Sequence, residues 1–202
     1  MESNLTDPDL LGKKEDITSR EEKAAARGGR RSRSSRWLLE VVIIVAAAFV
    51  LALLVQQFLI KPFAIPSPSM EPTLVEGDRV LVNRLVYHFR SPERGDVIVF
   101  HPPNYRGSDP FIKRVVAVGG DTIAVHDGKL YVNKVAQDES FIKEQLIQGD
   151  FPETRVPNGF VWAMGDNRNN SGDSRVFGPV SDDAIIGEAF AIYWPIGHVG
   201  GL

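Results

Sequence analysis

The sequence predicts a mainly β domain, an antiparallel β-sandwich or partly open barrel, joined to one N-terminal transmembrane helix. Two observations support this fold class. One long apolar run extends from Trp37 to Ile60, and after it come many short apolar runs separated by turns rich in Gly, Pro and Asp. Short strands with such turns are typical of sandwiches and barrels. Helical periodicity is weak after residue 60.

The N-terminal part predicts a tail followed by a membrane anchor. Residues 1–36 are polar and of mixed charge, so we expect a disordered tail. The tail ends in a basic block made of Arg27, Arg30, Arg31, Arg33 and Arg36. Residues 37–60 are almost entirely apolar and match the roughly 20 residues that span a bilayer as a helix. Because the basic block precedes the anchor, the tail should be cytoplasmic and residues 61–202 extracytoplasmic.

A cleaved signal peptide is the alternative interpretation of the apolar run. Such a peptide has a shorter apolar region that a small-residue cleavage site follows. Here the run is long and ends in Lys61-Pro62-Phe63. We therefore favour an uncleaved, single-pass anchor.

The composition excludes several kinds of site. The chain has no cysteine, which excludes disulfides, thiol catalysis and zinc–thiolate sites. Its four histidines lack the spacing of metal ligands, so we expect no metal and no cofactor. The net charge of −3 argues against a dedicated nucleic-acid binder.

Residues 61–202 contain several short apolar runs that predict strands. These are 79–83, 96–100, 113–118, 122–126, 129–133, 160–164 and 188–194. The dipeptide Asp127-Gly128 is a strong signal for a hairpin. Residues 134–159 are polar and poorly patterned, and we expect a long loop there.

Ser69 is the first candidate for chemistry. Most lone serines are turn residues or solvated hydroxyls. Here Pro66 and Pro68 favour extended geometry in the residues before them, so the side chains of Ser67 and Ser69 should point the same way. Two adjacent hydroxyls suit a nucleophile and an oxyanion donor. The alternative is a proline-rich linker that leaves the membrane.

Lys113 is the candidate base. It lies inside the apolar run 111–116. If it is buried, desolvation lowers its pKa, and a neutral amine can take the proton of Ser69. The alternative is an exposed lysine on an edge strand beside Arg114. The pattern alone does not choose between them.

A polar, glycine-punctuated segment at residues 164–175 is the third candidate element. In it, Asp173 and Arg175 can form an ion pair that braces the segment, and Ser171 can hydrogen-bond a neutral lysine amine. The alternative is an ordinary polar surface loop.

Together these elements resemble the type I signal peptidases, the membrane-anchored serine–lysine proteases of peptidase family S26. The resemblance covers the anchor and nearly all of residues 61–202. Five segments occur in the family's order: 66–74, 77–82, 94–100, 113–121 and 165–175. Any one of them is a weak signal, whereas five in order are highly specific.

The resemblance implies roles for the matching residues. Ser69 would be the nucleophile and Lys113 its general base, with the backbone N–H of Ser69 and the hydroxyl of Ser67 as the oxyanion hole. Ser171 would orient the lysine amine, and Asp173 with Arg175 would brace the site. Apolar residues would line pockets for small substrate side chains. These residues are Phe63, Ile65, Met70, Leu74, Val80, Val99 and Ile112.

The sequence departs from the family pattern in two places. Pro68 stands where glycine is more usual, which we expect to be tolerated because the oxyanion donor is the N–H of Ser69. The segment between Asn133 and Pro157 is short, whereas larger members carry a second β-domain there.

The implied function is signal peptidase I, a serine endopeptidase that removes signal peptides from secretory preproteins after Ala-X-Ala-type sites at the outer face of the plasma membrane. Expected partners are preproteins, membrane lipid and a nearby secretion translocon, and no nucleic acid. Three alternatives remain: a self-cleaving repressor-type protease, a serine–histidine hydrolase that uses His101, and a membrane-tethered β-domain that binds a partner. A bacterial membrane and an organellar membrane are not distinguished.

Overall fold

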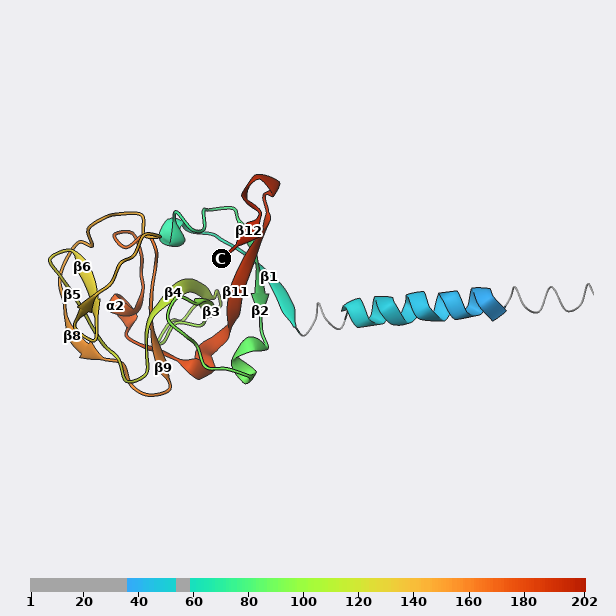
Figure 1. Ribbon diagram of the computed structural model, residues 1–202, viewed down its shortest axis with the longest axis horizontal. Coiled ribbons are helices and arrows are strands. Elements are labelled where there is room, and N and C mark those ends of the chain that lie inside the picture. The colour runs from blue at the N-terminus through green and yellow to red at the C-terminus, as the bar shows by residue number, and fades with distance from the viewer. Residues whose placement is uncertain (1–35, 54–58) are drawn as a thin grey trace, which may run out of the picture. The chain divides into compact units, whose positions relative to one another are not determined.

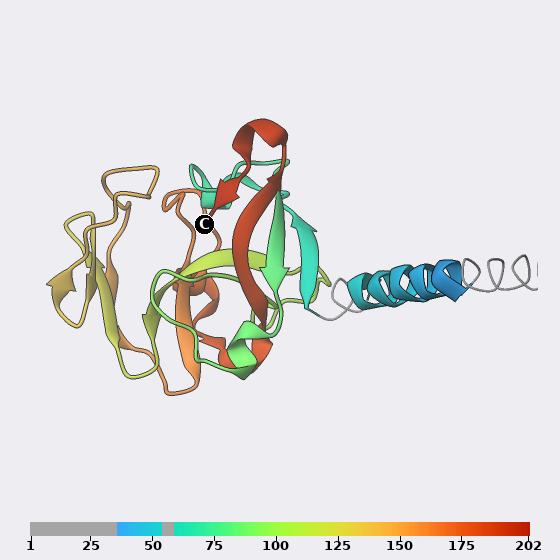
Figure 2. The same cartoon turned by 45° about the vertical axis from the view of Figure 1, so that its right-hand side comes forward.

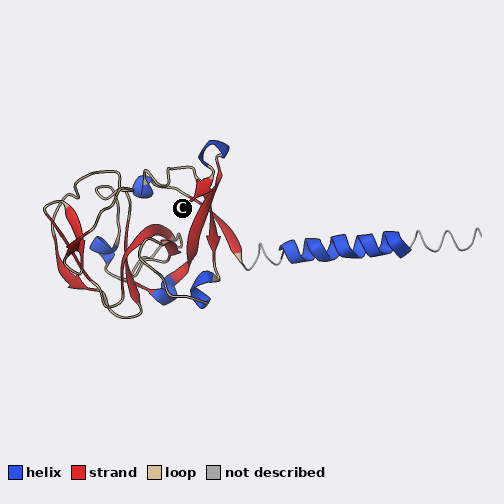
Figure 3. Cartoon of the chain, in the orientation of Figure 1, coloured by secondary structure: helices blue, strands red, loops and turns tan. Residues whose placement is uncertain are grey.

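The computed structural model describes residues 36–53 and 59–202, which belong to two separate units (Figure 1). In the first unit, the helix Arg36–Leu53 (Figure 3) is long and apolar enough to cross a membrane. Its side chains are exposed. The predicted disordered tail lies, apart from Arg36, outside the described residues. Residues 54–58 of the predicted span to residue 60 also lie outside the described residues. Ile60 instead opens strand β1 and pairs with Asn83.

The second unit is built on an eight-stranded antiparallel sheet. Its strand order is β1-β2-β11-β3-β4-β9-β10, and β12 pairs with β11. The strands are β1 (Ile60–Ala64), β2 (Arg79–Asn83), β3 (Val97–Phe100), β4 (Phe111–Val118), β9 (Phe160–Met164), β10 (Val180–Ser181), β11 (Ile185–Trp194) and β12 (Gly200–Gly201). The register shifts within β4 and β11, and such bulges bend a strand. The sheet is accordingly curled, as the curve of β11 shows (Figure 2).

A smaller four-stranded sheet has the order β7-β6-β5-β8. Its strands are β5 (Thr122–His126), β6 (Lys129–Val132), β7 (Val135–Ala136) and β8 (Phe151–Arg155). The hairpin expected at Asp127-Gly128 is present, and both residues have positive φ, as a type I′ turn requires.

The long loop predicted for residues 134–159 is wrong in part, because β7 and β8 lie within it. Strand β8 is an edge strand whose residues are exposed or half-buried. An edge strand that buries little carries no continuous apolar run, so its sequence reads as a loop. The other predicted strands are present, with bounds shifted by at most three residues.

Short helical turns complete the unit. They are η1 (Pro68–Met70), η2 (Val86–His88), α2 (Ser174–Phe177), η3 (Asp182–Ala184) and η4 (Ile196–His198).

The larger sheet is covered on both faces. All four residues of β3 are buried, and they alternate between two apolar clusters. Val97 and Val99 face the cluster that also holds Ile65, Met70 and Leu74 of the η1 region. The opposite cluster contains Val115, Val161 and Phe100. The η1 turn is thus anchored by apolar packing against the first face of the sheet.

Candidate active site

Ser69 lies at the centre of the short η1 turn. Ser67 precedes the turn in extended geometry, and Pro68 occupies its first position, where a missing N–H is tolerated. The Oγ atoms of Ser67 and Ser69 are 3.2 Å apart, and Ser69 is 7% exposed. The two hydroxyls are therefore neighbours. Ser69, however, belongs to a helical turn, whereas the sequence argument assumed an extended backbone through both serines. In the described part of the chain, no hydrogen bond engages the N–H of Ser69.

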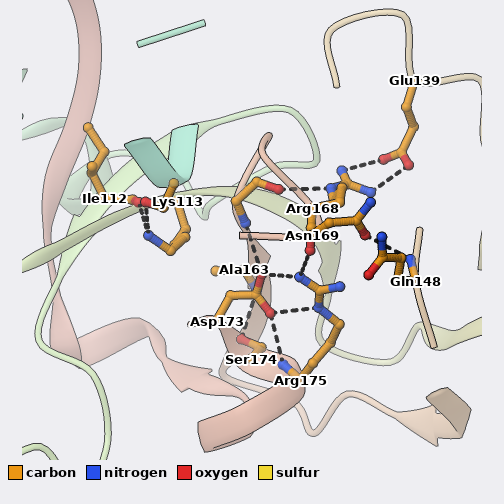
Figure 4. Close-up of polar contacts among 12 residues, drawn as sticks. Ile112, Lys113, Glu139, Gln148, Ala163, Arg168, Asn169, Asp173, Ser174 and Arg175 are labelled. Atoms are coloured by element: carbon orange, nitrogen blue, oxygen red, sulfur yellow. Dashed lines mark hydrogen bonds and ion pairs between the residues drawn. The ribbon is translucent and has the colours of Figure 1, made fainter. Parts of the chain in front are cut away.

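Lys113 on β4 is buried and points at Ser69. Its Nζ atom lies 2.7 Å from Oγ of Ser69 and donates at 2.8 Å to the carbonyl of Ile112 (Figure 4 draws the second contact). Only 4% of Lys113 is exposed. Burial lowers the pKa of Lys113 from 10.5 to about 8, although the charges of Asp173 and Asp166 act in the opposite direction. The sequence left open a buried lysine or an exposed lysine on an edge strand, and the structure shows the buried one.

Asp173 and Arg175 form the expected ion pair, with Nη2 of Arg175 2.8 Å from Oδ2 of Asp173 (Figure 4). The carboxylate of Asp173 is fully buried and also accepts the N–H of Gly165 at 3.1 Å. Nη2 of Arg175 donates to the carbonyl of Arg168 at 2.6 Å. The pair therefore ties together the start, middle and end of residues 165–175.

Ser171 does not make the contact that the resemblance implies. Its Oγ atom is buried and has no hydrogen-bond partner among the described residues, Lys113 included. It lies instead where the start of the loop 165–175 closely approaches the η1 turn. A Cβ atom at Gly165 would collide with Oγ of Ser171 and with the carbonyl oxygen of Ser69. Only glycine at residue 165 fits between them.

The roles of two more residues, Asp166 and Asn167, could not be read from the sequence. The N–H of Asn167 donates to the carbonyl of Ser69 at 3.1 Å, and its Nδ2 donates to the carbonyl of Pro68 at 3.0 Å. Asp166 is fully buried, pairs with Arg114 at 2.7 Å and accepts the hydroxyl of Thr73 at 2.6 Å. The position of Asp166 and Asn167 within a polar segment after a buried strand was the only signal available.

The seven residues proposed to contact substrate gather in one apolar cluster next to η1. Only one of them, Ile112, lines the cavity of about 440 Å³ that opens beside Ser69 and Lys113. Met70, Leu74 and Val80 are completely buried. The other walls come from Pro66, Ser67, Pro68, Tyr105, Asp109, Pro110, Phe111, Asn170 and Gly172. Tyr105 and Asp109 were not anticipated from the sequence.

The site differs from a serine–histidine arrangement. His101 is exposed just after β3, and in the part of the chain that the structure describes its ring makes no hydrogen bond to Ser69. Within residues 36–53 and 59–202, no group of three or more His, Asp or Glu side chains is placed to hold a metal ion. The groups positioned for chemistry are a hydroxyl, a lysine amine and nearby backbone donors, which suit acyl transfer.

Comparison with known proteins gives consistent matches. The family model described as "Signal peptidase, peptidase S26" matches residues 36–194. A probable signal peptidase I-1 of Synechocystis is 45% identical over 159 residues, which cover 76% of this chain and 81% of that protein. Thylakoidal processing peptidase 1 of Arabidopsis thaliana is 41% identical over 154 residues, 72% of this chain and 45% of that protein. A crystal structure of a signal peptidase I from Enterococcus faecalis is 30% identical, with a TM-score of 0.43, over 49% of this chain and 97% of that one.

Proposed function

Since this chain belongs to the signal peptidase family, peptidase S26, we propose that Ser69 and Lys113 are the residues with which it cuts signal peptides. As a member of the family, it is a serine endopeptidase that acts on the signal peptides of secretory preproteins. The observation that supports the proposal is the 2.7 Å distance between Nζ of Lys113 and Oγ of Ser69.

The proposed first step is acylation of Ser69. The neutral amine of Lys113 takes the hydroxyl proton of Ser69, and Oγ attacks the scissile carbonyl carbon. The N–H of Ser69 and the hydroxyl of Ser67 donate to the oxyanion that forms. When the C–N bond breaks, the Lys113 ammonium gives its proton to the leaving amine. The signal peptide stays attached to Ser69 as an ester.

Deacylation uses the same lysine. Its neutral amine takes a proton from water, and the resulting hydroxide attacks the ester carbonyl. The C–O bond to Ser69 breaks, and Oγ regains the proton from Lys113. Because Lys113 must be neutral at the start of each step, its lowered pKa of about 8 increases the reactive fraction. At neutral pH about a tenth of the molecules would carry a neutral lysine, compared with about one in a thousand for a solvated lysine.

For substrate choice we propose cleavage after small residues of the Ala-X-Ala type. The seven candidate substrate-contacting residues gather in one apolar cluster next to η1, which suits small apolar side chains. Ile112, a member of this cluster, also lines the cavity beside Ser69.

For location we propose a single-pass protein of the plasma membrane with a cytoplasmic N-terminus and residues 61–202 outside. The basic block before the apolar run supports this orientation. Ser69 follows Leu53, the last residue of the described apolar helix, by 16 residues, which reach at most about 53 Å when extended. The site would then work near the lipid surface and near a translocon, where signal peptides emerge.

The test is cleavage of a purified preprotein with an Ala-X-Ala site by the full chain in detergent. Wild type and His101→Ala should cut after the second alanine, and Ser69→Ala should not. Equal cutting by wild type and Ser69→Ala would exclude Ser69 as the nucleophile. Loss of cutting in His101→Ala alone would favour the serine–histidine alternative. A folded wild type that cuts nothing would favour a β-domain that only binds a partner.

A further inference from the structure

Residues 137–148, here named the strap, form most of the connection from β7 to β8 and lie against the loop 165–175. Three backbone groups of the strap bond to that loop. The N–H of Lys143 donates to the carbonyl of Asp166 at 3.1 Å. The N–H of Gln148 donates to Oδ1 of Asn169 at 2.7 Å (Figure 4). Nδ2 of Asn169 donates to the carbonyl of Leu146 at 3.1 Å. The strap is thus joined along its length to the loop that carries Ser171 and Asp173.

The strap also supplies the partner of a buried arginine. Both Nη atoms of Arg168 bond to the carboxylate of Glu139, at 2.6 and 2.7 Å (Figure 4). The side chain of Arg168 is 0% exposed and that of Glu139 is 8% exposed. The Nε atom of Arg168 donates to the carbonyl of Gly165 at 2.9 Å. A two-point charged contact of this kind fixes the orientation of a guanidinium group as well as its position.

Arg168 is adjacent in sequence to the residue that holds the nucleophile. Asn167 donates through its backbone N–H to the carbonyl of Ser69 and through Nδ2 to that of Pro68. The path from Glu139 to Ser69 therefore consists of an ion pair, the peptide bond between Arg168 and Asn167, and one hydrogen bond to the Ser69 carbonyl, while a second hydrogen bond holds the adjacent Pro68. Its other branch reaches Gly165, which packs against the Ser69 carbonyl.

We propose that Glu139 is a positioning residue for Ser69, acting through Arg168 and Asn167, an inference that rests on the proposed role of Ser69 as nucleophile. A buried ion pair is seldom retained for stability, because well-packed apolar residues often stabilise the same site equally well. It does fix geometry, and the proton transfer between Ser69 and Lys113 needs geometry held to about 0.5 Å. Without the Glu139 charge, the buried guanidinium must move toward water and take Asn167 with it.

The test compares four variants of the full chain in detergent with wild type, on the same preprotein and below the melting temperature of each. Glu139→Gln removes the charge, and Asp138→Asn is the matched control. Asp138 is an exposed neighbour with no ion pair or side-chain hydrogen bond in the described part of the chain. Asn167→Ala removes the side-chain link to Pro68. The double variant Glu139→Gln/Asn167→Ala measures whether the two residues act along one path.

We expect Glu139→Gln to lower kcat by about tenfold or more, with KM within about twofold of wild type, since a misplaced nucleophile slows chemistry more than binding. Asp138→Asn should match wild type. The double variant should lose clearly less than the product of the two single losses. The alkaline rise of kcat should keep its midpoint, because Glu139 acts on Ser69 and not on the charge of Lys113.

Several outcomes would overturn the inference. A kcat of Glu139→Gln equal to that of wild type, with only the melting temperature lowered, would mean that the pair is purely structural. Multiplicative losses in the double variant would mean that Glu139 does not act through the side chain of Asn167 and its bond to Pro68. If Glu139→Gln does not fold, Glu139→Asp moves the carboxylate back by one methylene group, so it cannot hold both Nη atoms of Arg168 in place and should still lower kcat. A wild-type kcat in Glu139→Asp would therefore exclude the positioning role. Wild type that cuts nothing would instead refute the proposed function itself.

Discussion

The Nζ atom of Lys113 lies 2.7 Å from Oγ of Ser69, although 44 positions separate the two residues in the chain. Ser69 is held by the η1 turn, and Lys113 by the middle of β4. Both are buried, so water competes little for the contact. This pairing supports the proposed mechanism, and its consequences can be measured.

The first prediction concerns pH. The pKa of Lys113 is about 8 in the folded protein, and the reactive form is the neutral amine. Activity should therefore rise about tenfold per pH unit below pH 8 and level off above it. The measurement is kcat/KM for a preprotein across pH 5 to 10. A flat profile between pH 5 and 9 would contradict the role of Lys113 as the base.

The second prediction concerns the identity of the base. Lys113→Arg and Lys113→His should fold but lose nearly all cleavage, at least about a thousandfold, because arginine stays charged and imidazole is too short to keep the geometry. The measurement is single-turnover cleavage, with circular dichroism to verify folding. Lys129→Arg on β6 is the matched control and should act like wild type. Substantial cleavage by Lys113→Arg would exclude a lysine base.

The third prediction concerns the buried ion pair of Arg114 and Asp166. Arg114→Met leaves the fully buried Asp166 carboxylate without its charged partner. The free energy of unfolding should fall by about 3 kcal/mol. Arg94→Met is the control, because Arg94 is 41% exposed and its pair with Asp121 should contribute only about 0–1 kcal/mol. Urea titration of the full chain in detergent measures both, and equal losses would contradict the prediction.

The fourth prediction concerns Gly165. In Gly165→Ala the new Cβ meets the carbonyl oxygen of Ser69, a backbone atom that cannot swing aside. The η1 turn must shift, and kcat should fall by about a hundredfold. Gly197→Ala, which adds a Cβ with no atom within 4 Å, should retain wild-type activity. Wild-type kcat in Gly165→Ala would show that the loop yields at no cost to Ser69.

Local features of the fold were predictable from the sequence. Strands such as β2, β3 and β9 were found from their apolar runs, and the β5–β6 hairpin from Asp127-Gly128. These signals act between residues near one another in the chain, through turn geometry and the alternation of side chains. Strand β8 was missed because an edge strand with exposed side chains gives no such signal.

The family and its two central residues were also within reach of the sequence, because five motifs in order are specific. The burial of Lys113, in contrast, could not be predicted from the sequence. Its burial depends on η1 and the loop 165–175 packing over β4, and those segments lie more than 40 residues away in either direction. The contacts of Asn167 and the isolation of Ser171 depend on the same packing.

The amino-acid sequence by itself therefore determined seven of the twelve strands in the described residues, the apolar N-terminal segment and the identity of Ser69 and Lys113 as candidates. The tertiary structure alone decided that the lysine is buried against the serine and that Glu139 reaches Arg168. The physical reason is that desolvation and ion pairing depend on which distant segments exclude water from a group, and no local pattern encodes that.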